Sequence, residues 1–227
     1  PEHARNHNRS LVLQSLYRNG QASRADLARE TGLTRVTISD LVGELIAEGL
    51  VVEVGQRGDA RPGKPAVLLD VDRSAAQIVG VDLSEHAVFR GAVLDIDGRV
   101  LRSAEVALAG SRGEDAVAKV LALVDELVEA ATAPILGIGI GSPGIVDATG
   151  TIVAAPNLGW NDQPLQRILA ERTGLAVFVA NDANVAVLAE HGFGDAHGDM
   201  MLVKVGHGVG SGLLVAGALV FGSRFAA

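Results

Sequence analysis

The sequence predicts an α/β protein in which a small, mainly helical domain at residues 1–72 precedes a larger domain at residues 73–227. Apolar residues recur at helical spacing in three short segments before residue 50 and in strand-like runs from there on. An apolar fraction of 48% in 227 residues is enough for two cores. Acidic charge is concentrated in the second domain, because residues 1–72 hold 9 basic and 10 acidic residues and residues 73–227 hold 10 and 17.

Composition excludes several classes of protein. The chain contains no cysteine, which excludes a disulfide framework and cysteine-ligated metals in this stretch. Its six histidines are scattered and form no ligand cluster, so we predict no metal site and no cofactor. The first ten residues lack the apolar core of a signal peptide, and no apolar run reaches the roughly 18 residues of a membrane span. We therefore expect a cytoplasmic protein with no membrane partner.

The first domain is predicted to begin with three helices. The first helix covers about residues 8–18, where apolar residues fall on one face. Ser23 caps the second helix, with Asp26 as its capping-box partner. Thr34 caps the third helix, which carries a continuous apolar stripe and ends at Gly49.

A tight turn, Thr31-Gly32-Leu33, joins the second and third helices, and this arrangement is typical of a helix-turn-helix. In that motif the first residues of the second helix of the pair reach base edges in the major groove. Arginine can bind a guanine edge, while threonine and serine serve bases or phosphates. We therefore predict DNA contacts by Thr34, Arg35, Thr37 and Ser39. The alternative is a small helical bundle whose polar face is only solvated.

Two predicted strands, at residues 50–54 and 65–69, flank a loop rich in glycine and proline. A hairpin in this place is the wing of a winged helix. We predict that its three cations, Arg57, Arg61 and Lys64, contact DNA, since an arginine between glycine and proline suits a narrow A·T minor groove. An ordinary solvated basic loop is the alternative. Because the domain is nearly neutral overall, DNA binding must depend on the local placement of charge.

The second domain opens with three strands, a helix and a fourth strand. The strands are predicted near residues 77–83, 87–94, 99–106 and 135–140, and the helix covers residues 116–130. Asp97-Gly98 marks a hairpin between the second and third strands. This β-β-β-α-β order is the opening of an actin-like, ribonuclease-H-like ATPase-type lobe.

Four motifs then follow in order and, together with the winged helix, carry a family resemblance. They are GIGSPGIVD at 139–147, APNLGW at 155–160, VANDAN at 179–184 and GHGVGSG at 206–212. The whole chain, including the RPGKP wing, resembles the repressors and sugar kinases of the ROK family. Winged helices of the MarR type share much of the first pattern, so the first domain alone does not settle the family.

The resemblance implies a sugar site formed by Gly144, Asn157, Asn181 and Asp182. Neighbouring amide and carboxylate groups suit this role, because they donate to and accept from vicinal hydroxyls. In the kinases the residue that matches Asp182 is also the base that takes a proton from the phosphorylated hydroxyl. A helix cap is the alternative interpretation of Asn181 and Asp182.

The resemblance also predicts that kinase chemistry has been lost and that no residue is catalytic. The ROK kinases carry D-x-G-G-T-K after the first strand, where this chain has DLSEHA at 82–87. Both glycines and the lysine are absent, and Glu85 places negative charge where phosphates would lie. His207 stands where the kinases have threonine.

These features predict a sequence-specific transcriptional regulator of carbohydrate genes, most consistent with a repressor. Its expected partners are double-stranded operator DNA, a monosaccharide or sugar-phosphate effector, and further copies of itself as a homodimer or tetramer. The family's second sugar motif and cysteine-rich zinc loop would follow Ala227, so we expect an incomplete second lobe and allow zinc in a longer parent protein. The alternatives are an active ROK sugar kinase and a DNA-binding protein whose second domain is a scaffold that senses nothing.

Overall fold

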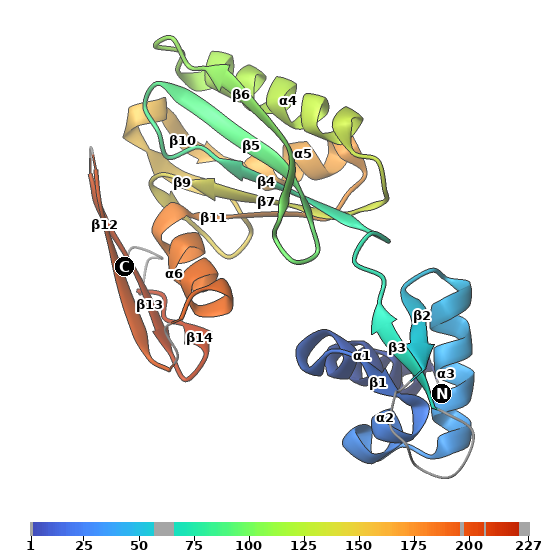
Figure 1. The fold of residues 1–227 in the computed structure, drawn as a ribbon. Coiled ribbons are helices and arrows are strands. Elements are labelled where there is room, and N and C mark those ends of the chain that lie inside the picture. Colours follow the sequence, from blue (N-terminus) through green and yellow to red (C-terminus); the bar gives the residue numbers. More distant parts are fainter. Residues whose placement is uncertain (1, 57–65, 196–197, 207, 223–227) are drawn as a thin grey trace. The chain divides into compact units, whose positions relative to one another are not determined.

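The computed structural model describes residues 2–56, 66–195, 198–206 and 208–222. Its chain divides into two compact units, Pro1–Ala75 and Ala76–Ala227, each treated by itself below (Figure 1). The sequence placed the boundary at residue 72. Within the described residues, no helix is long and apolar enough to cross a membrane.

Three helices and a three-stranded antiparallel sheet make up the first unit (Figure 1). The sheet has the order β1-β3-β2, as in a winged helix. The elements are α1 (Glu2–Asn19), β1 (Ala22–Ser23), α2 (Arg24–Thr31), α3 (Arg35–Ala47), β2 (Val51–Gln56) and β3 (Val67–Val71). Helix α1 begins before the predicted residue 8, because the sequence signal rested on apolar periodicity and the first turns of α1 are polar.

The predicted starts of α2 and α3 are confirmed. Ser23 accepts a hydrogen bond from the backbone of Asp26, whose carboxylate bonds back to Ser23, which completes the capping box. Thr34 caps α3 by accepting from the backbone N–H of Thr37 at 3.2 Å. The helices meet over one apolar cluster, so each buries its apolar stripe against the others. Its buried members are Val12, Leu16, Ala22, Leu27, Ile38, Leu41, Val42, Leu45, Val51 and Leu69.

The second unit contains a five-stranded mixed sheet, two three-stranded sheets and three α-helices among its described residues (Figure 1). Its elements are β4 (Gln77–Asp82), β5 (Val88–Asp95), β6 (Val100–Ala107), α4 (Gly113–Ala130), β7 (Ile135–Ser142), β8 (Ile145–Val146), β9 (Ile152–Ala155), η1 (Pro156–Leu158), β10 (Trp160–Gln163), α5 (Leu165–Thr173), β11 (Val177–Asn181), α6 (Asp182–Phe193), β12 (Met200–Val205), β13 (Val209–Val215) and β14 (Ala218–Leu219).

The large sheet has the strand order β11-β7-β4-β5-β6. Strands β4, β5 and β6 form an antiparallel meander, whereas β7 and β11 run parallel to β4. The predicted Asp97-Gly98 turn joins β5 to β6, with Gly98 in the left-handed region at φ 81°. Helix α4 lies against β5 and β6 and buries the predicted apolar stripe (Figure 1).

The three parallel strands end at the same edge of this sheet. Asp82 of β4 is in register with Gly141 of β7, and Ser142 is in register with Asn181 of β11. The loop after β4, the loop after β7 and the N-terminus of α6 therefore start side by side. Ligand sites of parallel sheets lie at this edge, so it is the first place to look for one.

Helix α6 packs on β12 and β13 (Figure 1). A side chain at Gly212 of β13 would lie 2.5 Å from the carbonyl oxygen of Ala183 in α6. Glycine at this position lets the strand backbone rest directly on the helix. This contact brings the glycine-rich segment of β13 to the same edge where the parallel strands end.

Candidate functional site

Helix α3 exposes one face and buries the opposite one. Ile38, Leu41 and Leu45 are buried in the core of the first unit. Arg35 and Ser39 are exposed on the other side of the helix. The apolar stripe thus fixes which residues remain available to another molecule.

The four residues of α3 predicted to bind DNA do not all have free side chains. Thr34 is exposed but serves as the helix cap, and its hydroxyl lies 2.9 Å from that of the half-buried Thr37. Arg35 and Ser39 are exposed and make no hydrogen bond or ion pair with other described residues. The wing cations Arg57, Arg61 and Lys64 lie outside the described residues.

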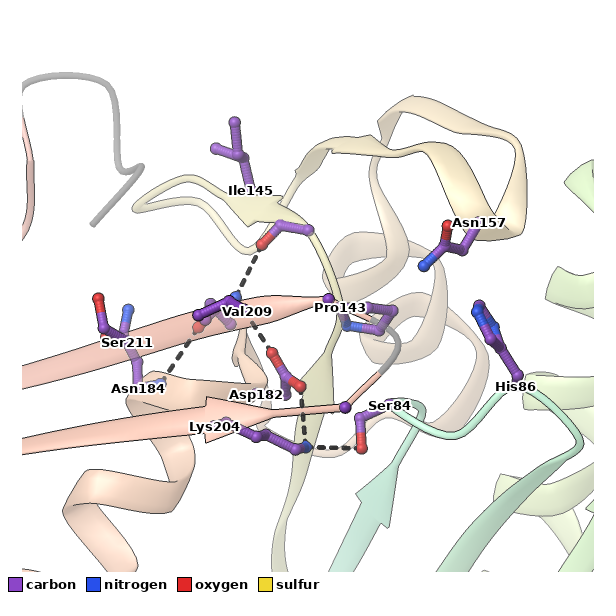
Figure 2. A pocket seen from close by; sticks show the side chains of 15 residues that line it. Ser84, His86, Pro143, Ile145, Asn157, Asp182, Asn184, Lys204, Val209 and Ser211 are labelled. Carbon is purple, nitrogen blue, oxygen red and sulfur yellow. Dashed lines mark hydrogen bonds and ion pairs between the residues drawn. The ribbon is translucent and has the colours of Figure 1, made fainter.

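A cavity of about 320 Å³ lies at the edge where β4, β7 and β11 end (Figure 2). The structure brings all four predicted sugar-site residues together in its wall: Gly144, Asn157, Asn181 and Asp182. The other lining residues were not predicted as site residues, although all but Lys204 lie in the segments quoted from the sequence. They come from the loop after β4, the loop after β7, β8, α6, β12 and the glycine-rich segment. These are Ser84, His86, Pro143, Ile145, Asn184, Lys204, Gly206, Gly208, Val209, Gly210 and Ser211.

Asn181 joins two loops of the cavity. Its side-chain oxygen accepts hydrogen bonds from the backbone N–H groups of Ala183 at 2.9 Å and Asn184 at 3.2 Å, so it caps α6. Its side-chain nitrogen donates to the carbonyl oxygen of Gly144 at 2.8 Å. The alternative interpretation of Asn181 as a helix cap is therefore confirmed, and the same cap holds the loop after β7 in place.

Gly144 is required by the backbone rather than by its own chemistry. Its φ of 89° lies in the left-handed region. A Cβ at this position would collide with the backbone of Ala154 and Ala155 in β9. The glycine lets the loop after β7 pass β9 and present its carbonyl oxygen to Asn181.

Lys204 joins the loop after β4 to the start of α6 in the cavity wall (Figure 2). Its ammonium group donates to a carboxylate oxygen of Asp182 and to the hydroxyl of Ser84, both at 2.8 Å. The second oxygen of Asp182 accepts from the side chain of Asn181 at 3.2 Å. A signal for Lys204 was present in the sequence, since this cation occupies an inward position of the otherwise apolar strand β12.

Asn184, on the first turn of α6, is 4% exposed and lines the same cavity. Its side-chain oxygen has no hydrogen-bond partner among the described residues. A buried carbonyl oxygen without a partner is unfavourable, so a ligand or water that donates to it would be stabilised.

The acidic residue of the loop after β4 does not face the cavity. Glu85 accepts a hydrogen bond from Arg90 and is absent from the residues that line the cavity. Arg90 pairs with Glu105 as well as with Glu85, so the repulsion of phosphates by Glu85 stays a prediction. His207 lies outside the described residues.

The charges of the cavity wall balance. Among its described residues, Asp182 supplies one carboxylate and Lys204 one ammonium group, His86 adds an imidazole, and the amides of Asn157, Asn181 and Asn184 supply uncharged polar groups. No cluster of three or more histidine, aspartate or glutamate side chains suited to a metal occurs in the described part of the chain. The wall is thus built for hydrogen bonding with little net charge.

The two units define a class of protein, namely a winged helix-turn-helix joined to a domain of the sugar-kinase type. Residues 78–227 match the ROK family and residues 6–62 match the MarR family. The chain belongs to the ROK family. The predicted family and fold class are confirmed.

Three relatives illustrate the range of this family. The chain is 34% identical over 229 residues to the xylose repressor of Caldicellulosiruptor bescii, covering 95% of this chain and 55% of that protein. A ROK family transcriptional regulator, a homologue of the Escherichia coli Mlc protein, matches with a TM-score of 0.81 and 27% identity over 98% of this chain and 57% of its own. A Streptomyces griseus ROK glucokinase, solved with glucose and AMPPNP, matches with a TM-score of 0.60 and 32% identity over 66% and 48%. The chain thus spans little more than half the length of these regulators.

Proposed function

We propose that this protein is a sequence-specific DNA-binding repressor of carbohydrate genes whose second unit senses a sugar. The observation that carries the proposal is the exposed Arg35 at the start of α3, in a helix-turn-helix that shares its chain with a ROK cavity. Arginine in this position can bind a guanine edge in the major groove. The relatives named as xylose repressors support the same function.

The effector that fits the cavity best is a neutral monosaccharide. Because Lys204 already pairs with Asp182, a phosphate group would enter a wall without net positive charge. Amide groups and the unpartnered oxygen of Asn184 suit the hydroxyls of an aldose such as xylose. The balance of charges in the wall thus favours a free sugar over a sugar phosphate.

Sensing without catalysis is supported by the contacts of Asp182. Both of its carboxylate oxygens already accept hydrogen bonds, one from Lys204 and one from Asn181. A general base must lie within hydrogen-bond reach of the hydroxyl that it deprotonates, and these two contacts limit the directions from which a hydroxyl can approach. We propose that this carboxylate orients a sugar and does not activate it.

We further propose that the protein works in the cytoplasm as a homodimer or tetramer on a two-fold symmetric operator. A sugar can change the affinity for DNA only if it binds two conformations of the protein unequally. Zinc is proposed only for a longer parent protein, since this chain contains no cysteine.

The test begins with duplexes selected by the chain from a randomised library. Their affinity is then measured at fixed salt against unselected duplexes, with and without D-xylose, D-glucose and glucose 6-phosphate. We expect the selected duplexes to bind about a thousandfold more tightly, and R35A to lose about ten- to hundredfold of that affinity. A neutral sugar should shift the affinity whereas glucose 6-phosphate should not. Equal affinity for selected and unselected duplexes would contradict the proposal.

A ROK sugar kinase is the second candidate, favoured by the similarity to the Streptomyces griseus glucokinase. It predicts ATP-dependent phosphorylation of D-glucose or D-xylose that is saturable in both substrates. Formation of ADP without a sugar phosphate would count against the kinase. Product formation that is lost in D182N would establish it and would remove the argument drawn from Lys204.

A further inference from the structure

The hydroxyl groups of Thr34 and Thr37 are engaged within the first unit. Thr34 accepts from the backbone of Thr37 at 3.2 Å, and the two hydroxyl oxygens lie 2.9 Å apart. A side chain that caps a helix keeps its position only while this hydrogen bond is made. The reading of bases by α3 must therefore depend largely on its other exposed residues.

Besides Arg35 and Ser39, three exposed residues form a stripe along α3. Val36 is 71% exposed, although it is apolar and lies one residue after the start of the helix. Asp40 and Gly43 are also exposed and follow it by four and seven positions, the spacing of one helix face. Along the stripe, Val36 presents an apolar side chain, Asp40 a carboxylate, and Gly43 a backbone without a side chain.

Gly43 has no explanation within the first unit. It lies in the middle of α3, and its φ falls outside the left-handed region in which glycine is favoured. A Cβ at this position would meet nothing within 4 Å. Glycine weakens a helix interior relative to alanine, so its presence here is better explained by another molecule that approaches the helix backbone closely.

The major groove offers a partner that matches both features. The C5-methyl group of thymine is the apolar group presented there, and small apolar side chains contact it. We propose that Val36 contacts a thymine methyl group of the operator, and that Gly43 lets the α3 backbone approach the DNA two helical turns further on. This inference rests on the proposed function, because it names the base chemistry read by the same helix.

The test replaces thymine by deoxyuridine, one position at a time, in the selected duplex. This change removes only the methyl group. For the unaltered protein we expect one position to lose about three- to fivefold in affinity, the contribution of one buried methyl group. V36A should lose a similar factor on the thymine duplex and should show no further loss at that same position.

One control variant, V100A, separates this contact from general effects, and one further variant, G43A, tests the close approach. V100A shortens a valine that is 60% exposed on β6 of the second unit, and its affinity should equal that of the unaltered protein. G43A should raise the thermal unfolding midpoint of the first unit, because alanine favours a helix interior more than glycine does. It should lower the affinity for the selected duplex at least about tenfold, because the new methyl group blocks the approach.

The outcomes distinguish this inference from the proposed function. If the protein binds the selected duplex specifically, but V36A and the unaltered protein respond equally to every deoxyuridine, the Val36 contact is wrong and the regulator stands. Unchanged affinity in G43A overturns the close approach. If selected and unselected duplexes bind equally, the proposed function fails and this inference fails with it. Capture of a protein by the same face, with no effect of deoxyuridine, would also overturn it.

Discussion

The exposed face of α3 and the cavity of the second unit place their functional residues in opposite ways. On α3 the exposed Arg35 and Ser39 point away from the core that holds the helix. In the cavity, Asn181, Asp182 and Lys204 bond one another and cap or join the elements that carry them. Binding and stability are thus separable on α3 and are coupled in the cavity. Substitutions in the two regions should reveal this difference.

The largest expected effect is at Gly144. G144A should lower the free energy of unfolding of the second unit by about 3 kcal/mol, because the added methyl group collides with β9 in a left-handed backbone conformation. Thermal and denaturant unfolding would measure it. G139A is the matched control, since a Cβ at Gly139 meets nothing within 4 Å and its change should be small. Equal stability of the two variants would show that the cavity wall adapts freely.

At Asn181 we expect the same coupling of binding and stability, with a smaller loss of stability than at Gly144. N181A removes the cap of α6 and the hydrogen bond to Gly144, so we expect a loss of about 1–2 kcal/mol in the free energy of unfolding. N161A, which alters an exposed asparagine of β10, should change it by less than about 0.5 kcal/mol. A sugar-binding loss in N181A without any loss of stability would break the comparison, because the site would then be separable from the fold.

Thr34 tests whether stability on α3 depends on the helix cap alone. T34A should cost the first unit about 1 kcal/mol, since α3 loses its cap, and T34S should restore most of that stability. S39A should leave stability within about 0.5 kcal/mol. Unfolding of the first unit measures both. Equal stability of T34A and the unaltered protein would show that Thr34, like Arg35 and Ser39, does not contribute to the stability of the first unit.

The smallest expected effect concerns the acid stability of the loop between β8 and β9. The hydroxyl of Thr149 donates to Asp147 at 2.6 Å and lowers the pKa of that carboxyl, and the backbone N–H groups of Thr151 and Thr149 act in the same direction. A lowered pKa in the folded state stabilises the protein above the unfolded value near 4 and ceases to do so as the pH falls through the folded value. D147N should therefore lose less stability between about pH 5 and pH 3 than the unaltered protein. Parallel loss in both would show that Asp147 contributes nothing.

Local signals in the sequence predicted the helix caps and the turn well. Ser23, Asp26 and Thr34 act within a few residues of each other, so their hydrogen bonds depend on little else. The start of α1 was missed because a polar helix leaves no apolar periodicity. The ion pair between Glu85 and Arg90 was not predicted, because a contact between a loop and the strand that follows it leaves no periodic signal.

The sequence by itself determined the family, the two units and the four motif residues of the cavity, since these depend on short segments with fixed spacing. Only the tertiary structure decided which polar groups complete the site. Lys204 lies 120 positions from Ser84 and 22 from Asp182, and the three meet because parallel strands end at one edge and β12 packs on α6. Contacts between residues so far apart follow from strand order and packing, which no local pattern specifies.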